Sequence, residues 1–272
     1  MKRAFKWLGG SLLLALIALF VIGYTPDTDP VAMRLKYGGQ EAKFVDIGGG
    51  LTMHYRDEGK RDGPVLVLLH GSNASLHTWE PWVARLVSKY RIISVDQIGH
   101  GLTGPNPTGQ YDGAAFVGTL NAALTKLGVT RFALAGNSMG GYVAWEYALA
   151  YPGKLTHLVL IDAAGPPDDP DKDLPIGFRI ARAPVLGKIA LIITPRSVFE
   201  RSLHGSVSNQ AIVTPAAIDR YWELNRIPGN RKATGERFAQ YGTRDTNTAR
   251  LGEIRIPTLI MWGAEDKLIP VS

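Results

Sequence analysis

The sequence predicts an α/β fold in which helices cover both faces of a mostly parallel β-sheet. Beyond residue 40, β-like apolar runs alternate with helical segments, which is the pattern of such a sheet. Several of these runs are apolar throughout and end in glycine, as buried parallel strands do. The 272 residues are 45% hydrophobic, so the chain can bury a substantial core in one domain with an insertion.

The first part of the predicted core contains five strands, of which the first two form a hairpin, and the helices between the later strands. "KFVDI" and "LTMHYRDEG" flank three consecutive glycines and predict the opening hairpin. "PVLVLLHG" and "RIISVDQIG" predict two buried strands, and "HTWEPWVARLVSKY" between them has helical spacing. Farther along, "AAFVGTLNAALTKLG" predicts a helix before the strand "RFALAGNS".

The alternation continues and then breaks. The helix "GGYVAWEYALAYP" precedes the strand "KLTHLVLIDAAG", after which residues 165–250 contain a Pro/Asp-rich stretch and several helical patterns. The core pattern resumes with "IRIPTLIMWG". We therefore expect residues 41–164 and 251–272 to form the core, and residues 165–250 to form a helical insertion.

The amino-terminal segment, residues 1–26, has the pattern of a membrane anchor. Three basic residues precede an uncharged stretch, and residues 7–24 as a helix would be about 27 Å long, close to the roughly 30 Å hydrocarbon core of a bilayer. We expect a transmembrane helix, a linker over residues 27–40 and an exported periplasmic or extracellular domain. The alternative is a cleaved signal peptide and a secreted protein, although residues 21–23 match a cleavage site poorly.

Composition excludes several kinds of partner and chemistry. The formal net charge of +6 is concentrated in residues 165–250 without any run of five like charges, so we expect no nucleic-acid partner. The absence of cysteine excludes disulfides, thiolate metal sites and a cysteine nucleophile. We expect neither a metal ion nor a cofactor.

The turn between the strand "RFALAG" and the helix "GGYVAWEYALA" contains the pattern G-x-S-x-G. The pattern alone is weak, but at a strand-to-helix turn it is typical of a nucleophile elbow. Gly136 and Gly140 would allow a sharp turn that raises the hydroxyl of Ser138 above the ends of the strands. The alternative is an ordinary glycine-rich turn in which Ser138 caps the helix.

Two backbone N–H groups could stabilise a developing oxyanion near this turn. The N–H of Met139 would lie at the amino terminus of the helix. His70 and Gly71 would turn the chain after a buried strand, which makes the N–H of Ser72 the second candidate. We interpret His70 as a residue that holds this loop by hydrogen bonds, and not as a catalytic base.

Four motifs together resemble the α/β-hydrolase fold superfamily of esterases and lipases, from about residue 40 onward. They are "HGSNASLHTW", "DQIGHGLTG", "GNSMGG" and "WGAEDKLIP". The resemblance implies that Ser138 is the nucleophile and that Asp266 orients the base. It also implies that Ser72 and Met139 form the oxyanion hole and that the helical insertion, residues 165–250, is a lid.

The catalytic histidine is not evident. In the resembling family the order is Ser, acid, His, but only six residues follow Asp266 and none is His. We therefore expect the histidine beyond residue 272, a chain that is truncated at its carboxyl end and inactive by itself, and an exposed sheet edge at "PTLIMWG". His100 and His204 are the alternative bases, and Glu265 and Asp162 the alternative acids, with Asp162 better suited to a turn.

Ser138 favours hydrolysis of a small apolar carboxylic ester through an acyl-enzyme. The dehalogenases and epoxide hydrolases that the family also contains would require Asp at this position. One alternative is a carbon–carbon bond hydrolase of the same fold. Another is a tethered binding protein on a hydrolase scaffold that has no catalytic activity.

Overall fold

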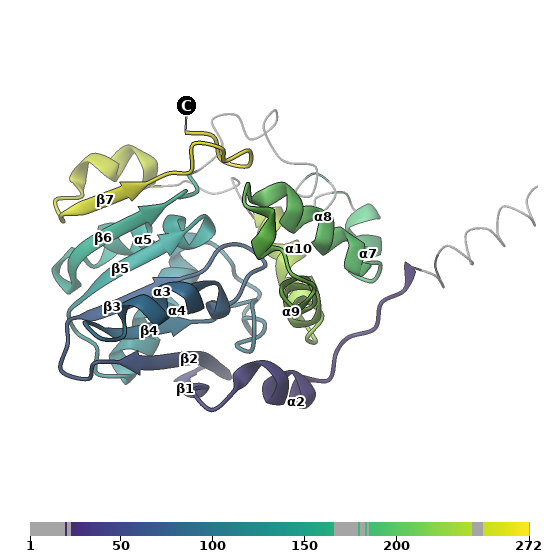
Figure 1. Ribbon diagram of the computed structural model, residues 1–272, viewed down its shortest axis with the longest axis horizontal. Coiled ribbons are helices and arrows are strands. Elements are labelled where there is room, and N and C mark those ends of the chain that lie inside the picture. Colours follow the sequence, from purple (N-terminus) through teal and green to yellow (C-terminus); the bar gives the residue numbers. More distant parts are fainter. Residues whose placement is uncertain are drawn as a thin grey trace, which may run out of the picture.

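A seven-stranded mixed sheet forms the centre of the computed structural model (Figure 1). Its strand order is β1-β2-β4-β3-β5-β6-β7; β1 and β2 run antiparallel to their neighbours, and the other pairs are parallel. The strands are β1 (Lys43–Gly48), β2 (Leu51–Gly59), β3 (Val65–Leu69), β4 (Arg91–Val95), β5 (Phe132–Asn137), β6 (Leu155–Ile161) and β7 (Thr258–Met261). The structure describes residues 20, 23–165, 179, 183, 185–240 and 247–271.

The predicted α/β class and the mostly parallel sheet are confirmed. The hairpin forms because Gly48, Gly49 and Gly50 all have positive φ, which lets β1 fold back on β2. The long apolar runs become β3, β4, β5 and β6, four of the five inner strands of the sheet. β5 lies between β3 and β6, so the turn at its carboxyl end is at the middle of the sheet.

Helices cover the two faces of the sheet, as the side chains of β3 show. Val67 and Leu69 belong to the larger apolar cluster, together with residues of α4 (Gly113–Lys126) and α5 (Met139–Ala150). Leu66 and Leu68, which alternate with them, pack with residues of η2 (Leu76–Trp79) and α3 (Glu80–Leu86). The short helices α2 (Pro30–Met33), η1 (Arg34–Gly38), η3 (Pro152–Lys154) and η5 (Asn247–Glu253) connect these layers.

Further helices come between β6 and β7 in the sequence, and they lie beside the carboxyl ends of the strands (Figure 1). We call them the cap helices: α7 (Leu186–Ala190), α8 (Arg196–Ser206), α9 (Pro215–Asn225) and α10 (Asn230–Gln240), with η4 (Gln210–Ile212) between α8 and α9. α10 contacts the loop that follows β3, because Arg237 donates hydrogen bonds to Ser72 and Asn73. That residues 165–250 act as a lid stays a prediction.

An amino-terminal strap, which we define as residues 23–37, joins the cap helices to the core. The N–H of Thr25 donates to the carbonyl of Ile192 (3.0 Å), and the Thr28 hydroxyl donates to the carbonyl of Glu223 in α9 (3.1 Å). At the other end of the strap, the carbonyl of Tyr37 lies 2.7 Å from Nε2 of His77 in the core. The strap therefore holds the cap helices against the sheet layer.

The prediction of a transmembrane helix over residues 7–24 is corrected by the structure. In the part of the chain that the structure describes, no helix is long and apolar enough to cross a membrane. Within the predicted span, residues 7–19, 21 and 22 lie outside the described residues. The end of the stretch leads directly into the strap, where Thr25 is buried against the cap helices.

β7 forms one edge of the sheet. It pairs with β6, and within the described ranges no strand pairs with its other side. All four of its residues are exposed, and 54% of Leu259 and 64% of Ile260 are accessible to solvent. The strand therefore presents apolar side chains and unpaired backbone groups to water.

Candidate active site

Ser138, the predicted nucleophile, occupies the turn between β5 and α5 with φ 54° and ψ −121°. Residues other than glycine rarely adopt this conformation, and it persists only where the surrounding structure enforces it. A Cβ atom on Gly136 would lie 2.1 Å from the carbonyl oxygen of Gly140, and one on Gly140 would lie 2.3 Å from the carbonyl oxygen of Leu69. The strand, the helix and the neighbouring loop approach this closely only because both positions are glycine.

Backbone hydrogen bonds hold Ser138 in this conformation. Its N–H donates to the carbonyl of Ile161 in β6 (3.0 Å). Its carbonyl accepts from the N–H groups of Gly141 (2.9 Å), Tyr142 (3.1 Å) and Ala164 (3.0 Å). The backbone of Ser138 is therefore fixed by the first turn of α5 and by residues at and just after the end of β6. These hydrogen bonds offset the strain at Ser138.

The two predicted oxyanion donors lie on segments that meet at Ser138. Met139 is the first residue of α5, so its N–H has no acceptor within the helix and lies at the positive end of the helix dipole. A Cβ atom on Gly71 would lie 3.3 Å from the Cβ of Ser138, which places the loop after β3 in contact with the turn. Ser72 follows Gly71, and its hydroxyl accepts a hydrogen bond from Arg237 of α10, a residue that the sequence did not indicate.

His70 joins the loops that follow β3 and β4. Its Nδ1 lies 2.7 Å from the carbonyl oxygen of Gly71 and therefore carries the proton, while Nε2 accepts from the N–H of Gln97 (3.1 Å). Burial lowers the pKa of His70, so the ring is neutral at neutral pH. Because backbone groups occupy both ring nitrogens, these contacts agree with a role in holding the loop.

The acid candidates cluster beyond β6 and β7. Oδ1 of Asp266 accepts from the N–H groups of Leu268 (2.7 Å) and Ile269 (3.0 Å), which orders the turn after β7. Oδ1 of Asp162, whose φ is 43°, accepts from the N–H of Gly263 (2.7 Å). Asp162 thus supports the turn that carries Asp266, whereas Glu265 is exposed. None of the hydrogen bonds found among the described residues joins Ser138 to these carboxylates.

All six histidines are described, and none hydrogen-bonds to Ser138 or Asp266. His100 is buried with Nδ1 2.9 Å from the carbonyl of Ile98, and burial and the positive charge of Arg237 hold its pKa well below the usual value. His204 is on the exposed side of α8 with Nδ1 2.5 Å from Oε1 of Gln210. Neither alternative base is therefore hydrogen-bonded to the predicted nucleophile.

A family model described as the alpha/beta hydrolase fold matches residues 64–272, which is most of the chain. This chain belongs to the alpha/beta hydrolase fold family. Its strand order and its strained serine turn between β5 and α5 are consistent with that membership. Its relatives include proteins that are named as hydrolases.

Three similar proteins show how far the likeness extends. An uncharacterized protein of Mycobacterium tuberculosis is 28% identical over 221 residues; the match covers 77% of this chain but only 63% of that protein. A 2-hydroxy-6-oxononadienedioate/2-hydroxy-6-oxononatrienedioate hydrolase of Paraburkholderia xenovorans is 29% identical over 246 residues, covering 85% of this chain and 81% of the relative. The crystal structure of a membrane phospholipase A is 27% identical with a TM-score of 0.70, covering 100% of this chain and 85% of that one.

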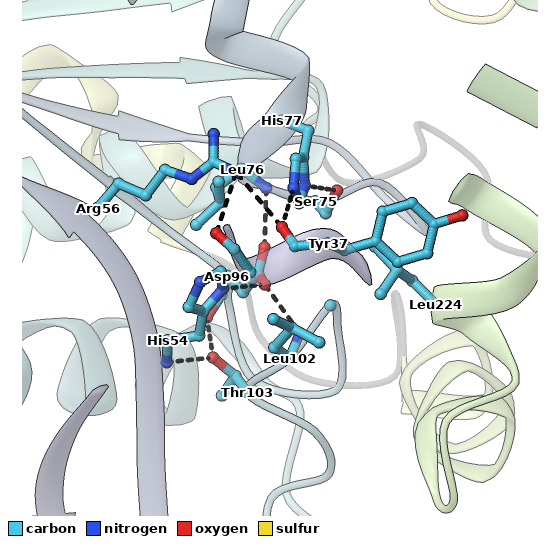
Figure 2. A network of polar contacts seen from close by, with 12 residues as sticks. Tyr37, His54, Arg56, Ser75, Leu76, His77, Asp96, Leu102, Thr103 and Leu224 are labelled. Atoms are coloured by element: carbon cyan, nitrogen blue, oxygen red, sulfur yellow. Dashed lines mark hydrogen bonds and ion pairs between the residues drawn. The ribbon is translucent and has the colours of Figure 1, made fainter. Parts of the chain in front are cut away.

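A buried carboxylate, Asp96, organises the loops of this family member at the carboxyl ends of β3 and β4 (Figure 2). Its Oδ2 lies 2.6 Å from Nδ1 of His54 and accepts from the N–H of Leu102 (2.8 Å), and its Oδ1 accepts from the N–H of Leu76 (2.8 Å). Burial raises the pKa of Asp96, but the charge and hydrogen bond of His54 outweigh burial and hold the pKa well below its usual range. Asp96 therefore stays ionised.

Close packing around Asp96 also depends on a glycine. A Cβ atom on Gly101 would lie 2.1 Å from Oδ2 of Asp96, so position 101 admits no side chain. The motif "DQIGHG" contains both residues, but its sequence does not show that Asp96 reaches back to β2 and to the loop after β3. In the described ranges, no group of three or more His, Asp or Glu side chains is arranged to hold a metal ion.

Proposed function

We propose that this hydrolase cleaves carboxylic esters through an acyl-enzyme on Ser138. The observation that carries the proposal is the strained conformation of Ser138, between the end of a central strand and the amino terminus of α5. The Ser138 hydroxyl oxygen attacks the ester carbonyl and forms a tetrahedral oxyanion, which the N–H groups of Met139 and Ser72 stabilise. The alcohol then leaves, and water hydrolyses the acyl-enzyme.

The proton of the Ser138 hydroxyl requires a base, which in this proposal is a histidine oriented by Asp266. None of the six histidines hydrogen-bonds to either residue, so we assign the base to none of them. That the base lies beyond residue 272, and that residues 1–272 alone are inactive, stay predictions. A protein of residues 1–272 could still hydrolyse the ester, and its His100→Gln and His204→Gln variants could keep that activity. This result would show that neither His100 nor His204 is the base.

The likeness to a membrane phospholipase A supports an ester substrate, because a phospholipase A is by name a hydrolase of acyl esters. The relative from Paraburkholderia xenovorans supports a second candidate, a carbon–carbon bond hydrolase, because its named substrate is cleaved at such a bond. Both reactions can use a serine in this turn. Turnover of 2-hydroxy-6-oxononadienedioate without turnover of any ester would favour the second candidate.

The test is ester hydrolysis by the protein at its natural length and by its Ser138→Ala variant. We expect hydrolysis of 4-nitrophenyl esters of short or medium acyl chains, and a fall in kcat of at least about a thousandfold in the variant. Ser206→Ala is the matched control, because that hydroxyl lies on α8 and donates to the carbonyl of Ser202. Equal activity of the Ser138→Ala variant and the control would contradict the assignment of the nucleophile.

A further inference from the structure

Arg237 is a buried cation that reaches from a cap helix to the loop after β3. Only 7% of this residue is exposed. Its Nη1 donates to the hydroxyl of Ser72 (2.7 Å) and its Nη2 to Oδ1 of Asn73 (2.9 Å). Both acceptors are neutral, and no carboxylate among the residues the structure describes forms an ion pair with Arg237.

The loop that receives these hydrogen bonds is held in an unusual conformation. Asn73 has a φ of 56°, which is uncommon for a residue other than glycine. Its Oδ1 also accepts from the hydroxyl of Thr234 (3.0 Å), one turn before Arg237 on α10. Two donors on the same face of α10 therefore fix one side chain of the loop.

The positive charge of Arg237 acts on the same part of the molecule. Burial lowers the pKa of Arg237 to about 9, so its guanidinium is still charged at neutral pH. Burial lowers the pKa of His70 and of His100, which follow β3 and β4, and the charge of Arg237 adds to this lowering. A buried charge with neutral partners lowers the stability of the fold. Because the Arg237 guanidinium binds the loop that carries a proposed oxyanion donor, we look for its role in that function.

We propose that Arg237 is a positioning residue that fixes Ser72 and Asn73, so that the N–H of Ser72 is directed at the oxyanion formed on Ser138. The proposal rests on the proposed function, in which Ser72 is one of the two oxyanion donors. The loop is close enough to act in this way, since a Cβ atom on the preceding Gly71 would lie 3.3 Å from the Cβ of Ser138. Through Arg237, the position of α10 determines whether the oxyanion hole is complete.

The experiment compares Arg237→Met with Arg231→Met in the full-length protein. Arg231 is a second buried arginine of α10, but it binds the strap and its surroundings: it donates to the carbonyl of Thr25 (2.6 Å), to the hydroxyl of Thr194 (3.1 Å) and to Asp27. Both variants replace a buried guanidinium with the same unbranched apolar side chain. Arg231→Met is therefore the matched control for lost stability.

We expect Arg237→Met to lower kcat for a 4-nitrophenyl ester about a hundredfold with KM unchanged, because a donor displaced by about 1 Å costs that much. Arg237→Lys, which keeps the charge and one donor, should recover part of kcat. Arg231→Met should lower the melting temperature but leave kcat near that of the wild type. Equal losses of kcat in the two Met variants would overturn the proposal.

A second outcome would also overturn it. If Arg237→Met raises KM for an ester whose acyl chain carries a carboxylate and leaves kcat unchanged, Arg237 binds substrate and does not position the loop. The test of positioning is repeated without substrate by amide hydrogen exchange at residues 71–73. Exchange at these residues should be faster in Arg237→Met than in Arg231→Met. Equal exchange in the two variants refutes the proposal. This measurement needs no ester hydrolysis, so it tests the proposal even if the proposed function is wrong.

Discussion

A single buried carboxylate illustrates how individual residues set the geometry of this site. Asp96 is fully buried, yet it accepts from a side chain of β2 and from backbone groups of two loops. The two loops follow β3 and β4, and the first of them also carries Ser72. Asp96 therefore fixes the far end of the loop that carries Ser72.

We predict that Asp96→Asn lowers the free energy of unfolding by about 3 to 5 kcal/mol, because it breaks a buried, hydrogen-bonded pair and turns an amide NH₂ toward groups that need an acceptor. Urea denaturation followed by circular dichroism measures the change. Asp219→Asn is the control: Asp219 pairs with Arg196 at the surface, where such pairs contribute about 0 to 1 kcal/mol. Similar losses in both variants would contradict the structural role of Asp96.

Among the elements, β7 differs from the other strands because its apolar side chains face water. Leu259, Ile260 and Met261 are exposed, and one side of the strand has no partner among the described strands. Natural edge strands are usually protected by charged residues, bulges or a covering element. Within residues 258–261 there is no charged residue.

We predict that a protein of residues 1–272 self-associates through β7 and that Ile260→Lys reduces this association. A lysine on an exposed edge opposes pairing with the edge of a second molecule, since the charge would have to be desolvated. Sedimentation velocity over a range of protein concentrations measures the effect. Leu35→Lys is the control, because Leu35 is also an exposed apolar residue but belongs to η1, which precedes β1 in the chain. A monomeric wild type would refute the prediction.

The elements themselves were largely predictable from the sequence, whereas the contacts between them were not. Apolar runs bounded by glycine correctly predicted the strands, because burial on both faces leaves a continuous hydrophobic signal. The hydrogen bond from Arg237 to Ser72 joins residues 165 positions apart, and no local pattern encodes such a contact. Hydropathy alone led to the wrong prediction of a transmembrane helix. The catalytic roles of Ser138 and Asp266 stay predictions.

At the scale of the whole molecule, buried ionisable groups make stability depend on pH. His70, His77 and His100 are buried, and burial lowers the pKa of each below its ordinary value of 6.5. As pH falls through 6.5, the unfolded chain binds protons that the folded chain does not bind. The pKa of Asp96 is also lowered, so its contribution to stability is lost at still lower pH, and the two effects have the same sign.

We predict that the free energy of unfolding falls between pH 7 and pH 5 by about 1.4 kcal/mol per pH unit for each proton bound on unfolding. Urea midpoints measured at intervals of half a pH unit give the slope. His100→Gln should reduce it, because one group that titrates only after unfolding is removed. His204→Gln is the control, since His204 is on the exposed side of α8. Equal slopes in the two variants would show that burial of His100 does not contribute.

The strap has a consequence for the order in which the chain folds. Thr28 binds Glu223 across 195 positions of sequence, and Thr25 binds Arg231 across 206. During synthesis on the ribosome, Glu223 and Arg231 are made long after the strap has left the exit tunnel. The strap therefore lacks its native contacts while the first strands of the sheet assemble. The strap is thus among the last segments to reach its native position, because it docks only after the cap helices have formed.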